Sequence, residues 1–135
     1  SRKAKKFYRD VFKVNPTFKE TRVNLAAILY NEKEYTEALD VILLSKVDPY
    51  WKRKQQNFSD NYDLYLKTIV NSWISSVIER SDMQEKKVLE KWMTGFDKDP
   101  SYTSRKTKAI FEIRQKEDVD YLTALMLFDK EREKK

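Results

Sequence analysis

Apolar side chains recur three and four positions apart along almost the whole chain, which is the spacing of an α-helix with one buried face. The stripe through Ala4, Tyr8 and Val11 is one example, and the step from Ile69 to Trp73 belongs to another. Short polar segments separate these stripes. The pattern therefore predicts an all-α chain of about seven helices joined by short loops.

Several residues mark where the expected helices begin and end. Pro16, Pro49 and Pro100 interrupt the stripes, because the residue before a proline is driven out of the α region. Asp82, with a Glu three positions later, predicts a helix N-terminus. Gly95 is the only glycine, and we expect it to end a helix as a left-handed C-cap.

Composition agrees with long helices and removes many kinds of chemistry. The 135 residues are 40% hydrophobic and 37% charged and include one Gly, which favours one domain of amphipathic helices. The chain has no Cys and no His, so disulfides, thiolate or imidazole catalysis and Cys/His zinc sites are excluded. No apolar run is long enough to span a membrane. We expect no enzymatic activity, no cofactor and no metal.

Residues 17–49 carry small and large side chains in a fixed order. They are Leu25, Ala26 and Leu29 in the first expected helix, and Tyr35, Ala38, Ile42 and Ser45 in the second, with Pro49 after it. This helix pair resembles a tetratricopeptide repeat (TPR), in which small residues let the two helices approach and larger ones fill the groove to the next pair. Two departures are Arg22, where the family has a large residue, and Lys33, where Gly is common.

The resemblance extends along the rest of the chain. Residues 1–16 are similar to the second helix of a half repeat, and 100–135 to a partial repeat with a charged tail, through Tyr121, Ala124 and Phe128. Residues 50–99 form a divergent, lengthened unit. The resemblance implies one TPR-like domain over 1–135, an α–α hairpin stack forming a segment of a right-handed superhelix. Because the chain opens in mid-repeat, we expect it to be a fragment of a longer protein.

A TPR-like stack implies a non-catalytic protein–protein interaction module, a scaffold or partner-stabilising adaptor. The groove would be lined by the first helix of each pair and would bind a peptide or another protein. Mapped onto the clear repeat, the partner-binding residues are Glu20, Asn24, Tyr30 and Asn31, with Val23 and Ala27 beside them.

The three tryptophans divide into two kinds. Trp73 and Trp92 lie within apolar stripes and are expected in the core. Trp51 stands among Lys and Arg residues outside any stripe, and we expect it to be an exposed partner-binding anchor.

The alternative function is binding of nucleic acid or another anionic surface, since the formal net charge is +6. Basic residues gather in three places, and the candidates are Lys3, Lys6 and Arg9, then Lys52, Arg53 and Lys54, then Arg105 and Lys106. Self-association through a terminal helix or the middle unit is a further possibility. The Gly-poor, Lys- and Asn-rich usage favours a bacterial source and is reminiscent of virulence-associated TPR proteins of the cell envelope, with any signal or anchor upstream of Ser1.

Overall fold

The structure, a computed structural model, describes residues 2–14, 19–43 and 59–133. In this part of the chain there are seven α-helices and one short 3-10 helix, and no strand. The predicted all-α class and the predicted number of helices are therefore confirmed for these residues. The chain divides into two compact units, Ser1–Tyr62 and Asp63–Lys135, and each is described by itself. The single domain over 1–135 stays a prediction.

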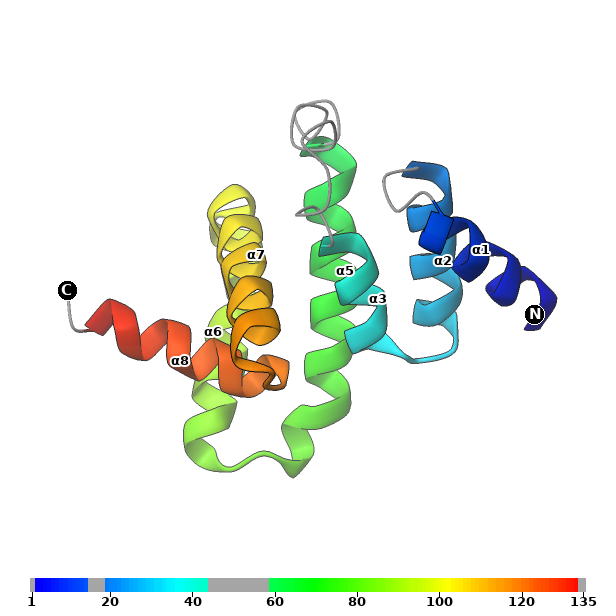
Figure 1. The fold of residues 1–135 in the computed structure, drawn as a ribbon. Coiled ribbons are helices and arrows are strands. Elements are labelled where there is room, and N and C mark those ends of the chain that lie inside the picture. The colour runs from blue at the N-terminus through cyan, green and yellow to red at the C-terminus, as the bar shows by residue number, and fades with distance from the viewer. Residues whose placement is uncertain (1, 15–18, 44–58, 134–135) are drawn as a thin grey trace. The chain divides into compact units, whose positions relative to one another are not determined.

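Where the structure describes it, the first unit contains α1 (Arg2–Val14), α2 (Lys19–Asn31), α3 (Tyr35–Leu43) and the start of α5 (Ser59–Val77). The central helix α2 packs against both α1 and α3 (Figure 1). Leu25 and Leu29 of α2 and Leu39 of α3 are buried in the core of this unit. Fully burying each such side chain contributes about 1.5–3 kcal/mol, so this face of the hairpin is the main source of its stability.

The residues that carry the TPR resemblance are buried where the structure describes them. Ala26 and Ala38 are both inaccessible, as small residues at a close approach of two helices would be. Arg22 is buried too, with only 1% of its surface exposed. Burial lowers the pKa of Arg22 to about 10, against a weaker opposing effect of Tyr62.

The turn between α2 and α3 explains why glycine would suit position 33. Lys33 has a φ of 64°, in the left-handed region. Its amide donates to the Tyr30 carbonyl at 2.9 Å, and the amide of Glu34 donates to the Leu29 carbonyl at 2.8 Å. These bonds satisfy carbonyls at the end of α2 as in a Schellman motif, which normally places Gly at such a position.

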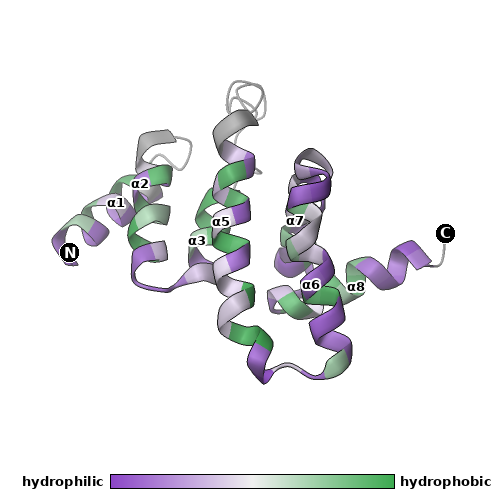
Figure 2. Cartoon of the chain, turned by 180° about the vertical axis from the view of Figure 1, so that it is seen from behind, coloured by the Kyte–Doolittle hydropathy of each residue, from purple (hydrophilic) through white to green (hydrophobic). Residues whose placement is uncertain are grey.

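The second unit contains most of α5 (Ser59–Val77), the 3-10 helix η2 (Ile78–Arg80), α6 (Met83–Lys98), α7 (Pro100–Glu117) and α8 (Tyr121–Glu133). Helix α7 packs against both α6 and α8, and α6 also contacts α8. Hydrophobic and hydrophilic residues both occur along each helix, as helices with one buried face require (Figure 2).

An aromatic cluster forms the centre of the second unit. Trp73 meets Trp92 edge to face, with ring centroids 5.7 Å apart, and meets Tyr121 in the same way at 6.0 Å. Both tryptophans are buried, so their predicted place in the core is confirmed. Such pairs add about 0.5–1.5 kcal/mol each beyond the area they bury.

Helix boundaries in this unit follow the predicted signals, with one correction. The Asp82 side chain accepts a hydrogen bond of 2.8 Å from the Glu85 amide and caps α6. The Asp99 side chain caps α7 in the same way, with Pro100 at its first position. Gly95, however, lies inside α6 and has no left-handed φ, so the predicted C-cap is wrong. It stands where α6 approaches Thr103 of α7, whose Oγ1 lies 2.8 Å from the place of a Cβ.

None of the helices in the described ranges is both long and apolar enough to serve as a membrane span.

Candidate functional site

The outer face of α2 is the surface on which the sequence predicts partner binding. Asn24, Ala27 and Asn31 are exposed at helical spacing on this face, whereas Leu25 and Leu29 are buried. The structure therefore brings together, on one exposed face, three of the residues mapped from the repeat. The Glu20 side chain and the whole of Trp51 lie outside the described residues.

Two of the predicted residues already have contacts within the unit. Asn24 Nδ2 donates to the Tyr8 hydroxyl of α1 at 3.3 Å. Tyr30 is half-buried and meets Tyr35 edge to face at 5.6 Å. These contacts hold both side chains in place, so the outer face of α2 presents fixed polar and aromatic groups next to α1 and α3.

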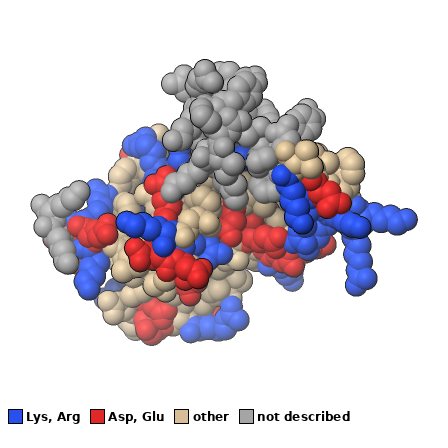
Figure 3. All heavy atoms as spheres, viewed as in Figure 1, with Lys and Arg blue, Asp and Glu red and all other residues tan. Residues whose placement is uncertain are grey.

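The basic side chains of α1 are partly neutralised by acidic residues of the α2–α3 hairpin. Lys5 Nζ lies 2.6 Å from Glu32 and 3.1 Å from Glu34, and Arg9 pairs with Glu37. Glu32, and then Glu34, raise the pKa of Lys5, and the hydrogen bond from Lys5 lowers the pKa of Glu34. Figure 3 likewise shows acidic atoms beside the basic ones on the face it presents. These pairs tether α1 to the hairpin.

The remaining predicted anion-binding residues are divided between the two units, and some lie outside the described residues. Lys3 and Lys6 are exposed on α1. Arg105 is exposed on α7 and donates to Ser101 of its own helix at 2.8 Å. Its neighbour Lys106 is instead buried, only 9% exposed. The cluster Lys52, Arg53 and Lys54 lies outside the described residues.

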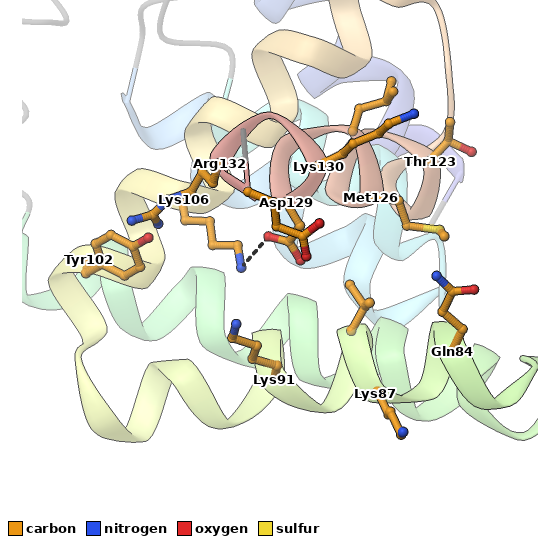
Figure 4. Close-up of a pocket in the computed structure, with 13 residues that line it drawn as sticks. Gln84, Lys87, Lys91, Tyr102, Lys106, Thr123, Met126, Asp129, Lys130 and Arg132 are labelled. Carbon is orange, nitrogen blue, oxygen red and sulfur yellow. Dashed lines mark ion pairs between the residues drawn. The ribbon is translucent and has the colours of Figure 1, made fainter. Parts of the chain in front are cut away.

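A groove that the sequence analysis did not predict lies in the second unit, between α6 and α8 with α7 at one end. Its volume is about 1040 Å³. The α6 wall is made by residues at helical spacing, Gln84, Lys87, Val88 and Lys91. Figure 4 shows α6 on one side of the groove and α8 on the other. We call it the α6/α8 groove.

The other lining residues come from α7 and α8. Helix α7 contributes Tyr102 and Lys106. Helix α8 contributes two apolar residues and five polar or charged ones, namely Met126 and Leu127, then Thr123, Asp129, Lys130, Arg132 and Glu133. In Figure 4, Gln84, Thr123 and Met126 lie toward one end, and Tyr102, Lys106 and Arg132 toward the other.

Positive charge dominates the α6/α8 groove. Among the residues that the structure describes, five cationic and two acidic side chains line it. The Lys106 ammonium pairs with Asp129 at 3.2 Å and lies 5.5 Å from the centre of the Phe128 ring. Because Asp129 is used in this way, it offsets little of the remaining charge. Within the described part of the chain, Lys87, Lys91 and Lys130 take part in no ion pair.

Aromatic rings contact the Arg132 guanidinium at the end of the groove near Tyr102 and Lys106. Arg132 lies over the Tyr102 ring at 5.2 Å and over the Phe128 ring at 5.8 Å. These cation–π contacts hold the guanidinium against the protein. The groove thus offers cations next to partly exposed apolar residues, and two of these cations, Lys106 and Arg132, are held by other side chains.

Sequence reasoning missed most of the groove. Only Lys106 was among the predicted anion-binding residues. A signal existed in Lys87, Val88 and Lys91, where an apolar residue stands between two lysines one turn apart. Their exposure, and the α8 residues opposite, depend on how the helices pack.

No protein-family model, curated protein or solved structure matches the chain.

Proposed function

We propose that the protein is a non-catalytic, TPR-like interaction module that binds a polypeptide on its helix faces. One observation carries the proposal. In each unit a middle helix packs against the helix before it and the helix after it, α2 against α1 and α3, and α7 against α6 and α8. The TPR resemblance implies this order for the half repeat 1–16 followed by the clear repeat 17–49, and it implies that α7 and α8 are the two helices of the partial repeat from 100.

The buried pattern of the clear repeat supports the same proposal. Ala26 and Ala38 are buried as small residues, and the polar residues Asn24 and Asn31 remain exposed. Helix faces that stay polar and rigid beside a packed hairpin are suited to binding a peptide, because amides satisfy backbone groups and a ring supplies contact area.

The test is position-resolved crosslinking. A photoreactive residue replacing Asn31 should capture a protein from an extract of the source organism, whereas the same residue replacing the exposed Glu117 should not. Capture should be lost on Tyr30→Ala, with circular dichroism confirming that the helices remain. Equal capture at both positions, or recovery of nucleic acid alone, would contradict the proposal.

Binding to nucleic acid or another anionic surface is the second candidate, and the formal net charge of +6, with Lys3 and Lys6 exposed on α1, favours it. It predicts that affinity falls steeply as salt is raised, since each phosphate contact releases counterions. Binding insensitive to salt would count against it. The bacterial source and the envelope location stay predictions.

A further inference from the structure

The α6/α8 groove leaves apolar surface open to solvent. Leu127 is 37% exposed, and Val88 and Met126 are partly exposed. Apolar residues rimmed by polar ones are a common feature of binding surfaces. Lys87, Lys91 and Lys130 line the same groove. In Figure 4, Lys91 points into the groove, whereas the Lys87 ammonium points away from α8.

We propose that the α6/α8 groove is a docking site for an acidic, amphipathic helix of a partner polypeptide. This inference rests on the proposed function, polypeptide binding, and specifies which kind of polypeptide is bound. It places that polypeptide between α8, which the resemblance matches to the second helix of a repeat, and α6 of the divergent unit. The TPR resemblance instead implies the surface lined by the first helix.

The shape of the groove favours a helix as its occupant. Both walls are helices that present residues three and four positions apart, from Gln84 to Lys91 on α6 and from Thr123 to Lys130 on α8. An amphipathic helix inserts anchors with the same spacing into such a groove. The volume of about 1040 Å³ is at the upper limit of the roughly 300–1,000 Å³ that small-molecule pockets occupy.

The charge of the groove favours acidic residues on that helix. Val88, Met126 and Leu127 would contact its apolar face, and Lys87, Lys91 and Lys130 would pair with Asp or Glu beside that face. Opposite potentials across an interface speed association and exclude wrong partners.

A nucleic acid fits the same groove poorly. Single strands are bound by exposed aromatic rings on which bases stack, next to a continuous basic track. Of the described lining residues, Tyr102 alone is aromatic, and Arg132 already lies 5.2 Å over its ring. Val88 and Met126 also interrupt the lysines. The groove therefore lacks a stacking platform.

The test uses the full chain and a labelled synthetic peptide of about 14 residues, or four helical turns. Its leucines lie three and four positions apart, with glutamates beside them. Fluorescence anisotropy should show binding. A peptide of the same composition in shuffled order, and one with lysine in place of glutamate, should bind at least about tenfold more weakly.

Matched variants locate the site. Lys87→Gln with Lys91→Gln removes two groove cations and should weaken binding about tenfold, as two partly exposed ion pairs would. Lys3→Gln with Lys6→Gln removes two exposed cations of α1 and should leave affinity unchanged. Met126→Gln should also weaken binding, which simple charge attraction would not predict.

The outcomes separate this inference from the proposed function. No binding of the acidic peptide, equal binding of the shuffled peptide, or equal loss in the α1 variant would overturn the groove assignment. A single-stranded oligonucleotide that binds more tightly than the peptide and loses affinity in the groove variant would also overturn it. Crosslinking at Asn31 would remain as support for polypeptide binding in each of these cases.

Discussion

The indole of Trp92 donates a hydrogen bond from Nε1 to Oγ1 of Thr107, 2.9 Å away inside the second unit. Trp92 is 1% exposed and Thr107 is fully buried, so water cannot replace this acceptor. The Thr107 hydroxyl in turn donates to the Thr103 carbonyl at 2.8 Å. The bond thus links α6 to the α7 backbone through one side chain.

Thr107→Val should destabilise the protein by about 1–3 kcal/mol, because it leaves the buried Trp92 N–H without an acceptor. Thr107→Ser keeps the hydroxyl and loses one methyl group, at an expected cost of about 1 kcal/mol or less. Urea unfolding followed by far-UV circular dichroism compares the two. A valine variant no less stable than the serine variant would contradict this role of Thr107.

Gly95→Ala tests the close approach of α6 to α7. In an open helix this change stabilises by about 1 kcal/mol. Here a Cβ would stand 2.8 Å from Thr103 Oγ1, which is held by a 2.9 Å bond to the Asp99 carbonyl, so we expect a loss of about 1–3 kcal/mol.

A double-mutant cycle provides the control for Gly95. In a Thr103→Ala background the obstruction is gone, and Gly95→Ala should become neutral or stabilising. The exposed Thr94→Ala, on the same helix, should not depend on Thr103. If Gly95→Ala has the same effect in both backgrounds, the two residues do not restrict each other.

The contrast between Trp92 and Gly95 shows what the sequence could and could not predict. The period of apolar residues is a local property, and it placed the helices and the two core tryptophans correctly. Asp82 and Asp99 cap helices through bonds within four residues, so such signals are also readable. The role of Gly95 depends on a contact with α7, and a single glycine near a helix end gave no sign of it.

The two candidate surfaces also differ in how far the sequence predicts them. The TPR resemblance implied that Asn24 and Asn31 share one surface, and both are exposed on one helix, seven positions apart. The α6/α8 groove depends on which faces of α6 and α8 remain uncovered after α7 packs against both helices. Arg105 and Lys106 are adjacent in sequence, yet one is exposed and the other is buried beside Asp129, so a cluster along the chain was not a cluster in space.

Lys33→Gly should stabilise the first unit by about 0.5–1 kcal/mol, since glycine adopts a positive φ without the cost that a Cβ brings. Asp118 also has a positive φ, 52°, but aspartate tolerates this region better. The gain from Asp118→Gly should therefore be smaller. Urea midpoints measure both, and a loss of stability in the Lys33 variant would show that its side chain matters more than its backbone.

Acid should weaken the tether between α1 and the α2–α3 hairpin. Lys5 lowers the pKa of Glu34 in the folded state. The stability from this carboxyl is therefore present above its unfolded pKa of about 4.3 and is lost as pH falls through the folded value. Stability measured by urea unfolding from about pH 5 to pH 3 should fall less steeply in Glu34→Gln than in the wild type.

Lys5→Met provides the matched check, because it removes the cation that lowers the pKa of Glu34. This variant too should lose less stability than the wild type between about pH 5 and pH 3. Parallel pH curves for the wild type and both variants would mean that the pair contributes nothing to stability.

The most direct test of polypeptide binding is an amide NMR titration of the isotope-labelled full chain with the acidic amphipathic peptide. The predicted result is a set of chemical-shift changes confined to the walls of the α6/α8 groove, strongest near Val88, Lys91 and Met126. Changes that are absent, or that spread evenly over the basic residues of α1 and α7, would contradict the account.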